Sequence, residues 1–340
     1  MAPLVSPPLG AAFAGRRVFV TGAYGMLGAW LTRALLDRGA SVVVLRRDER
    51  PGSALTLDGT EARCTVVRGD LLDADLLERT VGEHEIDTVL HLAAQTIVGT
   101  ANRSPRSTFE SNVRGTWNVL EAVRAHDVPR TVVASSDKAY GASDVLPYTE
   151  DLPLRAAHPY DASKAAADLI ARSYAHTYGL GVAVTRLANI YGGGDQNPSR
   201  LIPEAIAAVF EGRAPVVRSD GSPERDFLYV EDAVDAYLAI LDLLDAGPDS
   251  PARGAAFNAG GGAPHRAIDV VRAVCAAGGR PDVEPDVRGT GTPDGEIDRQ
   301  WVDASRLRDL TGWAPQVDLD DGLRRTIAWY REHPAALRPA

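Results

Sequence analysis

The stretch Arg17-Val18-Phe19-Val20-Thr21-Gly22-Ala23-Tyr24-Gly25-Met26-Leu27-Gly28 decides the fold of this chain. Its first five residues are an apolar run typical of a strand that is buried on both faces. Three glycines follow in the pattern Gly-x-x-Gly-x-x-Gly, and a helical pattern then continues through Leu36 and ends near Gly39. Glycines between a first strand and a first helix permit a tight turn and let backbone N–H groups approach a pyrophosphate. The stretch therefore predicts a dinucleotide-binding loop.

The rest of the first half repeats this alternation of apolar runs and helical patterns. Strands are predicted at 41–45, 65–68, 88–92, 131–134 and 182–186, and helices at 109–125 and 161–178. The second of these helices stops at Gly179, a residue type that commonly ends helices. Strands of continuous Val, Leu and Ile separated by helices indicate a parallel sheet covered on both faces. We therefore predict an α/β fold with a Rossmann-like doubly wound sheet, whose ligands bind beyond the carboxyl ends of the strands.

After Ile190 the pattern loosens into Gly- and Pro-rich connections, which indicates a second, smaller domain. A helix at 230–244 and a strand at 255–258 could return to the main sheet, and a last helix is predicted at 323–332. We accordingly predict a disordered tail at 1–14 and a dinucleotide-binding domain at 15–190 to which 230–260 returns. Segments 191–229 and 261–335 would form a substrate-binding α/β domain. Two facing lobes provide a cleft for a small molecule.

Composition excludes several classes of function. The 340 residues carry a formal net charge of −10 without basic runs, which argues against nucleic-acid and anionic-membrane partners. No segment has the length and apolarity of a membrane span or the pattern of a signal peptide. Cys64 and Cys275 lack metal-ligand spacing. We expect a cytoplasmic protein without a bound metal.

Lysine is nearly absent from the chain. Among 36 basic residues only Lys138 and Lys164 are lysines. Tyr160 and Lys164 are spaced i, i+4 at the start of a predicted helix, so they share one face. An ammonium beside a phenol lowers its pKa and makes it a usable base near neutral pH. With Ser136 at the end of a strand, the three side chains could deprotonate a carbinol while its hydride leaves for a nicotinamide.

The residue that ends the second strand faces the adenosine ribose in this fold. An acid there accepts a hydrogen bond from the 2′-hydroxyl of NAD, whereas a basic residue suits the 2′-phosphate of NADP. The chain has Arg46-Arg47-Asp48 at this point. The arginines slightly favour NADP over NAD, and Asp48 leaves NAD open.

The motifs together resemble the extended short-chain dehydrogenase/reductases of the NAD-dependent epimerase/dehydratase type, from Arg17 to about Tyr330. The resemblance rests on Gly22 to Gly28, Asp70, His91-Leu92-Ala93-Ala94, Ser136, Tyr160-x-x-x-Lys164 and Arg186-Leu187-Ala188-Asn189-Ile190-Tyr191-Gly192. It implies a tightly bound, recycled NAD(P) and a homodimer paired through the helices at 109–125 and 161–178. The implied cofactor contacts are Gly22, Tyr24, Gly25, Met26, Leu27, Gly28, Arg46, Arg47, Asp70, Leu71, Leu92, Ala93, Ala94, Asn112, Tyr160 and Lys164.

The two residues after the catalytic serine separate the reactions of this family. The pair Asp137-Lys138 is similar to that of CDP-glucose 4,6-dehydratases, as are Gly28-Ala29-Trp30-Leu31 and Gln95. The resemblance implies that Tyr160 takes the proton of the sugar 4-hydroxyl while hydride leaves carbon 4. A protonated Asp137 would donate to the departing 6-hydroxyl. Lys138 stands where other dehydratases have a glutamate base for carbon 5, and it could serve as that base only when neutral.

The substrate implied by the resemblance is a nucleotide diphosphate sugar. Its candidate contacts are Gln95, Asn189, Arg200, Arg225 and Arg299, since arginines suit bidentate phosphate contacts. His158 lies just before Tyr160 and is a weaker candidate. A nucleotide-sugar 4-epimerase or a UDP-glucuronate decarboxylase shares the first oxidation and stays an alternative. A non-catalytic NAD(P)-sensing protein is the remaining one, although such proteins usually lack the tyrosine–lysine pair.

Overall fold

A seven-stranded parallel sheet forms the centre of the first domain in the computed structural model, which describes residues 13–291 and 297–337. The strand order is β10-β6-β5-β4-β1-β2-β3. The strands are β1 (Arg17–Thr21), β2 (Ser41–Arg46), β3 (Thr65–Arg68), β4 (Thr88–His91), β5 (Arg130–Ala134), β6 (Val182–Leu187) and β10 (Ala256–Ala259). The predicted doubly wound sheet is confirmed, including the return of the strand predicted at 255–258, which pairs with β6.

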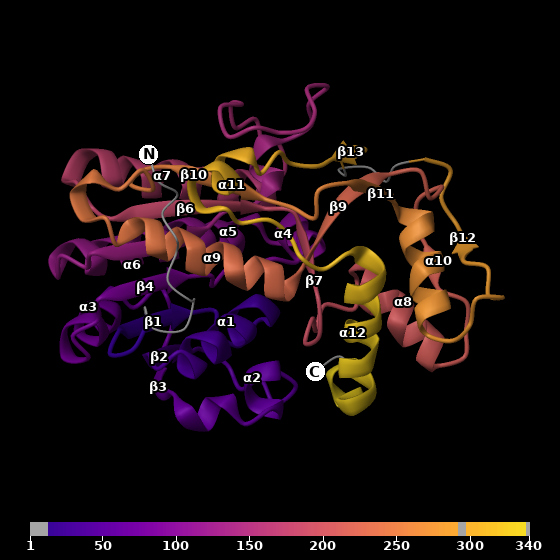
Figure 1. The fold of residues 1–340 in the computed structure, drawn as a ribbon, viewed down its shortest axis with the longest axis horizontal. Coiled ribbons are helices and arrows are strands. Elements are labelled where there is room, and N and C mark those ends of the chain that lie inside the picture. Colours follow the sequence, from indigo (N-terminus) through magenta and orange to yellow (C-terminus); the bar gives the residue numbers. More distant parts are fainter. Residues whose placement is uncertain (1–12, 292–296, 338–340) are drawn as a thin grey trace.

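Helices cover both faces of this sheet (Figure 1). One core lies between the sheet and helices α1 (Met26–Asp37) and α9 (Val230–Leu244), and the other lies under α3 (Ala74–Glu83), α6 (Gly115–Ala125) and α7 (Pro159–Tyr178). The inner strands β4 and β6 are buried throughout, as expected for strands covered on both faces. This arrangement directs the carboxyl ends of all seven strands toward the second domain.

The helix predicted at 109–125 is interrupted in the structure. Its segment consists of α5 (Pro105–Phe109), a π-helical turn (Glu110–Arg114) and α6. The buried Asn112 lies in the π-helical turn, where its side chain exchanges hydrogen bonds with the backbone of Gln95 (2.7 and 3.0 Å). Such turns widen a helix locally and are frequent at functional sites.

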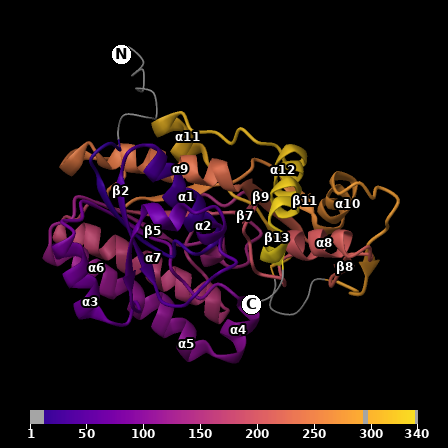
Figure 2. The ribbon, with the colours of Figure 1, turned by 90° about the horizontal axis from the view of Figure 1, so that it is seen from below.

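The second domain lies beyond the carboxyl edge of the sheet, at the right of Figure 1. A small sheet has β9 (Glu224–Tyr229) at its centre, with β7 (Asn189–Tyr191), β11 (Pro264–Arg266) and β13 (Arg299–Gln300) beside it. Figure 2 shows the same lobe from below. Its remaining elements are α8 (Leu201–Phe210), α10 (Ala267–Ala277), α12 (Leu319–Glu332) and the pair β8 (Val216–Val217) and β12 (Asp286–Val287).

Two predicted boundaries are wrong. Phe13 is fully buried in the first core, so residues 13 and 14 belong to the folded domain; the rest of the predicted tail lies outside the described residues. Helix α11 (Ser305–Thr311) packs with the dinucleotide-binding domain rather than the second one, because Leu307 and Trp313 join the same core. The indole N–H of Trp313 also donates to the carbonyl of Asp232 in α9 (3.1 Å).

Candidate active site

The glycine loop joins β1 to α1 at the carboxyl edge of the sheet. Gly22 has a φ of +80°, and a Cβ there would lie 2.6 Å from the backbone nitrogen of Ala93. A Cβ on Gly28 would lie 2.1 Å from the carbonyl oxygen of Gly22. Gly25 is the N-cap of α1, and no side chain caps the helix. Backbone N–H groups at this helix end are thus available to a pyrophosphate, which fits a dinucleotide cofactor.

The ends of β3 and β4 form the walls beside this loop. The carboxylate of Asp70 accepts from the backbone N–H of Leu72 (2.9 Å) and is half exposed. The carbonyl of the buried Leu71 accepts from the Asn118 amide (2.9 Å). Leu92 and Ala93 donate their backbone N–H groups to Thr21 (3.1 and 3.3 Å), which brings the segment from Leu92 to Ala94 against the glycine loop.

Asn112 and Gln95 position this wall. The Asn112 amide also donates to the Ser163 hydroxyl (2.9 Å), so it links the loop after β4 to α7. The Gln95 side chain bonds to the backbone of Ile97 and to Thr108. Because these contacts occupy its side chain, Asn112 would affect a bound cofactor indirectly, by fixing the loop after β4. Met26 and Leu27 pack their side chains in the cores, so only their backbone groups face the loop.

The first turns of α7 carry the predicted tyrosine and lysine. Tyr160 and Lys164 are both buried and lie one turn apart. The Lys164 ammonium donates to the carbonyl of Ala134 at the end of β5 (2.8 Å). Ser136 follows the same strand and lies near the Tyr160 phenol, whose pKa it lowers against burial. The structure thus brings the three predicted side chains together.

Burial governs the protonation of this pair. Desolvation raises the pKa of Tyr160 to about 12, and the Asp137 carboxylate adds to the rise, while Arg200 and Ser136 oppose it. Desolvation lowers the pKa of Lys164 to about 8. In the protein alone the phenol is held protonated, because burial and the Asp137 charge outweigh the charge of Arg200. Activation of Tyr160 by Lys164 stays a prediction.

Asp137 is a buried carboxyl beside this pair. Its Oδ1 accepts from the Ser136 hydroxyl (3.1 Å), and its Oδ2 has no hydrogen-bond partner within the described residues. Desolvation raises the pKa of Asp137 to about 6, although Lys138, Ser136 and Arg225 act in the opposite direction. The carboxyl can therefore hold a proton near neutral pH, as a general acid must.

Lys138 is half-buried in the turn after Asp137. Burial raises the pKa of Asp137 and of Asp161, and the positive charge of Lys138 lowers both pKa values against that rise. It makes no ion pair within 13–291 and 297–337. Lys138 thus lies close to Asp137 and Asp161, and its positive charge acts on both carboxyls.

The predicted substrate residues differ in their placement. Arg225 donates a hydrogen bond to the carbonyl of Asp298 (2.9 Å), and its positive charge lowers the pKa of Asp137 against burial. Arg200 forms an ion pair with Asp195 (2.7 Å), and its positive charge lowers the pKa of Tyr160 against burial. The amide of Asn189 donates to the Asp226 carbonyl (3.3 Å). Arg299, in contrast, is exposed and pairs with Glu224 (2.9 Å).

His91 has a structural role. Its ring nitrogens contact Thr21 (2.7 Å) and Thr116 (3.0 Å), and burial with the nearby Lys164 lowers its pKa to about 3. The imidazole therefore stays neutral and ties β4 to β1 and α6. His158 is the N-cap of α7, beside Tyr160 and Asp161, and its charge lowers the pKa of Asp161 against burial.

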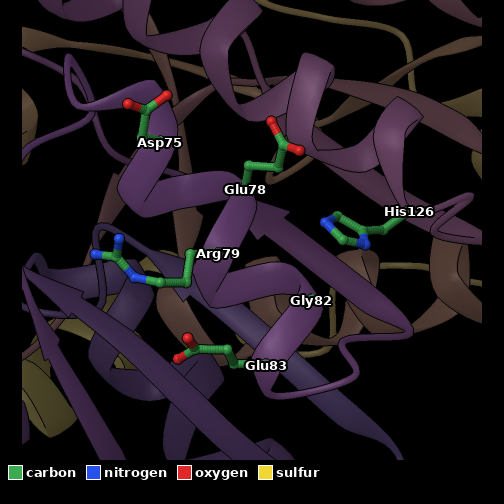
Figure 3. A pocket seen from close by; sticks show the side chains of 6 residues that line it. All are labelled: Asp75, Glu78, Arg79, Gly82, Glu83 and His126. Atoms are coloured by element: carbon green, nitrogen blue, oxygen red, sulfur yellow. The ribbon is translucent and has the colours of Figure 1, made fainter.

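Two surface cavities accompany the site. The larger, about 680 Å³, lies between α3 and His126 and is lined by charged side chains (Figure 3). Because α3 leads into β4 and His126 precedes β5, this cavity lies at the amino edge of the sheet, away from the chemistry. The smaller, about 390 Å³, lies at the carboxyl edge and is lined by Arg47, Asp70 and residues around α5. Only the smaller one adjoins the predicted cofactor residues.

Comparison with known proteins agrees with this geometry. Residues 18–260 match the family model described as the NAD dependent epimerase/dehydratase family. The chain belongs to this family. It is 34% identical over 331 residues to a dTDP-glucose 4,6-dehydratase of Xanthomonas campestris pv. campestris, covering 92% of each chain. It is 33% identical over 323 residues to a UDP-glucose 4-epimerase of Mycolicibacterium smegmatis, covering 93% of this chain and 98% of the relative.

Solved structures of the family superpose over nearly the whole chain. A dTDP-glucose 4,6-dehydratase from Streptomyces venezuelae with NAD bound gives a TM-score of 0.83 at 31% identity, covering 95% of this chain and 100% of that one. The two relatives are named for reactions on nucleotide sugars, a dehydration and an epimerisation, and the match to the family supports an enzyme of this general kind. No helix in the described part of the chain is long and apolar enough to cross a membrane. Nor do His, Cys, Asp and Glu side chains gather as a metal site within those residues.

Two acids near the site escaped the sequence analysis. Asp226 is fully buried in β9, its Oδ1 accepts from the Gly261 N–H (2.7 Å), and burial raises its pKa to about 7. Its position after Arg225 was visible, but only the fold shows that the side chain turns inward. Glu61 lies in a short 3₁₀ turn (Thr60–Arg63) between β2 and β3, where no spacing pattern marks a functional residue.

Proposed function

We propose that this enzyme is a nucleotide-sugar 4,6-dehydratase, which converts an NDP-hexose to its 4-keto-6-deoxy derivative. The observation that carries the proposal is the buried Asp137 with a pKa raised to about 6 by desolvation, next to Ser136 and Tyr160. Elimination of water requires an acid at the 6-hydroxyl, whereas a 4-epimerase requires none. A carboxyl that is partly protonated at neutral pH meets this requirement.

The cofactor fits the site because the glycine loop leaves no room for side chains and opens the N-terminus of α1. Gly22, Gly25 and Gly28 would cradle the pyrophosphate, and Asp70 would meet the adenosine. When bound, NAD(P)⁺ accepts hydride from carbon 4 of the sugar and returns it at carbon 6. The preference for NADP predicted from Arg46 and Arg47 is not part of this proposal.

In this proposal Tyr160 removes the proton of the 4-hydroxyl, and Ser136 orients that hydroxyl through its own hydrogen bond. Tyr160 must be a phenolate to take this proton and becomes a phenol in doing so; the Lys164 ammonium, fixed by Ala134, would stabilise the phenolate before the transfer. Asp137 then delivers its proton to the departing 6-hydroxyl as the hydrogen on carbon 5 is lost. Its unpartnered Oδ2 is the oxygen available for this transfer, since Oδ1 is held by Ser136.

Lys138 is proposed to remove the proton from carbon 5 and to return it. This role requires a neutral amine, since only the free electron pair of the nitrogen can accept the proton.

The diphosphate is proposed to lie near Arg225 and Arg200, whose charges reach Asp137 and Tyr160 respectively. Asn189, Gln95 and Arg299 stay predicted contacts. The base and hexose of the substrate are unassigned, and the likeness of Asp137-Lys138 to CDP-glucose dehydratases stays a prediction.

A 4-epimerase is the second candidate, and it is favoured by the absence of a glutamate at Lys138 and by the epimerase relative. A decarboxylase and a non-catalytic sensor complete the alternatives. Incubation of the purified protein with CDP-glucose, dTDP-glucose, UDP-glucose, GDP-mannose and UDP-glucuronate separates them by product mass. Loss of water supports the dehydratase, unchanged mass with a new sugar supports the epimerase, and loss of carbon dioxide supports the decarboxylase.

We further propose a cytoplasmic homodimer paired through α5, α6 and α7. Large apolar side chains are exposed on these helices, namely Phe109, Trp117, Leu169 and Tyr178. Apolar surface of this kind is typical of interfaces. The molar mass in solution, measured by light scattering, tests the pairing.

A further inference from the structure

Glu61 joins the glycine loop to the end of β2. It lies in a 3₁₀ turn, Thr60–Arg63, between β2 and β3. Its Oε1 accepts from the Tyr24 phenol (2.7 Å) and from the Arg46 guanidinium (2.7 Å). Tyr24 is part of the loop predicted to hold the pyrophosphate, and Arg46 occupies the position that faces the adenosine ribose. An acid thus stands beside the ribose position, although β2 itself ends in an arginine.

Within the described residues, the arginines nearest Arg46 are paired with carboxylates. Arg46 is largely buried, and it also lies 3.4 Å from Glu49. Arg47 pairs with Asp48 (2.7 Å) and lies 4.0 Å from Asp70.

Arg68 completes the group by pairing with Glu49 (3.2 Å). Three arginines therefore face four carboxylates: Asp48, Glu49, Glu61 and Asp70. A 2′-phosphate carries close to two negative charges at neutral pH and is held in proteins by uncompensated arginines.

We propose that Glu61 is a specificity-determining residue that makes this site select NAD over NADP. By engaging Arg46 and Tyr24 together, Glu61 neutralises Arg46, the residue that ends β2. It also places a carboxylate where a 2′-phosphate would be repelled. NADP could bind only by breaking the Arg46–Glu61 pair, whereas NAD brings no charge to that position. The inference rests on the proposed function only in requiring that the chain binds a nicotinamide dinucleotide, and it replaces the preference for NADP predicted from Arg46 and Arg47.

Tyr24 gives this arrangement its fixed geometry. Burial and the adjacent Glu61 both raise the pKa of the phenol above its usual range, so it remains a hydrogen-bond donor. The Thr56 hydroxyl contacts the second oxygen, Oε2 (3.4 Å). Both carboxylate oxygens are therefore engaged by groups of the dinucleotide-binding domain, and the acid cannot simply swing into solvent without losing them.

The test is direct binding of NAD⁺ and NADP⁺ to the full chain, measured by isothermal titration calorimetry. The wild-type protein should bind NAD⁺ at least about tenfold more tightly than NADP⁺, which corresponds to about 1.4 kcal/mol. E61Q keeps the size and an acceptor oxygen while removing the charge. It should raise the affinity for NADP⁺ by about tenfold or more and change that for NAD⁺ by less than about threefold. E49Q is the matched control, because Glu49 is exposed and also near Arg46 but has no contact with the glycine loop; its selectivity should stay that of the wild type.

R46A is the second variant. Added to E61Q, R46A should abolish the gain in NADP⁺ affinity and leave NAD⁺ binding within about threefold, because the released Arg46 is the group that would hold the 2′-phosphate; a gain that persists in E61Q/R46A would overturn the role given to Arg46. A wild-type preference for NADP⁺, or unchanged selectivity in E61Q, would overturn the inference. Failure of the proposed function has a different signature, namely NAD-selective binding controlled by Glu61 without conversion of any sugar nucleotide. Binding of neither dinucleotide by folded protein would overturn both.

Discussion

Asp137→Asn separates the catalytic and the structural consequences of burying an acid. The pKa of Asp137 is raised from 3.8 to about 6 by desolvation. At pH 7 about a tenth of the molecules then hold the proton, against fewer than about a thousandth for an ordinary aspartate. Asn cannot donate that proton. We expect water elimination to fall by about 10²–10⁴-fold, the usual contribution of general acid catalysis, while oxidation at carbon 4 persists and reduced cofactor accumulates.

The same substitution should stabilise the protein at high pH. A carboxyl whose pKa is higher in the folded state than in the unfolded state favours folding when protonated, and this contribution is lost as pH rises toward 6. The shift corresponds to about 3 kcal/mol. An unpaired Asn amide at the position of Oδ2 costs about 1 kcal/mol, which leaves a gain of about 2 kcal/mol for D137N at pH 8.

Urea titrations at several pH values measure this gain, with the exposed Asp309→Asn as control. The difference in unfolding free energy between D137N and wild type should grow by about 1 kcal/mol from pH 5 to pH 7 and then level off. The control should show no such trend. A D137N protein that eliminates water at the wild-type rate, or whose stability follows the wild-type pH dependence, would refute the reasoning.

Tyr160→Phe removes the phenol that receives the 4-hydroxyl proton, so cofactor reduction at 340 nm should fall by about 10²–10⁴-fold; near-normal reduction would contradict the assignment. Lys138→Ala should still reduce the cofactor at carbon 4 yet stop water loss, and unimpaired dehydration measured by product mass would remove Lys138 from the mechanism. Gly28→Ala places a Cβ 2.1 Å from the Gly22 carbonyl oxygen; calorimetry should show dinucleotide affinity reduced by at least about tenfold, and unchanged affinity would exclude this loop as the cofactor site.

The sheet and its order could be predicted because each strand is an apolar run between helical patterns. Burial on both faces leaves β4 and β6 without polar alternation, which is a signal readable in sequence. The break in the helix at 109–125 was not readable, since it depends on Asn112 reaching Gln95 across space. The placement of α11 failed for the same reason, because Leu307 finds its partners in a distant core.

The site divides along a similar line. Motif spacing brought Ser136, Tyr160 and Lys164 together correctly, since one helix turn and one strand end fix them. Their protonation could not be predicted, because desolvation depends on everything packed around the phenol and the ammonium. Arg46 was recognised by its position at the end of β2. Its partner Glu61 comes from a segment without periodicity, so the neutralisation of Arg46 appears only in the structure.

The most direct test of the central claim follows one isotope through the reaction. Each NDP-hexose is prepared with deuterium at carbon 4 and incubated with the protein as purified, and the product is analysed by mass and by NMR. The account predicts loss of one water with the deuterium found at carbon 6. The cofactor accepts the deuteride from carbon 4 and would return it to carbon 6 of the same sugar. Product of unchanged mass with deuterium still at carbon 4 would contradict it and identify the enzyme as an epimerase.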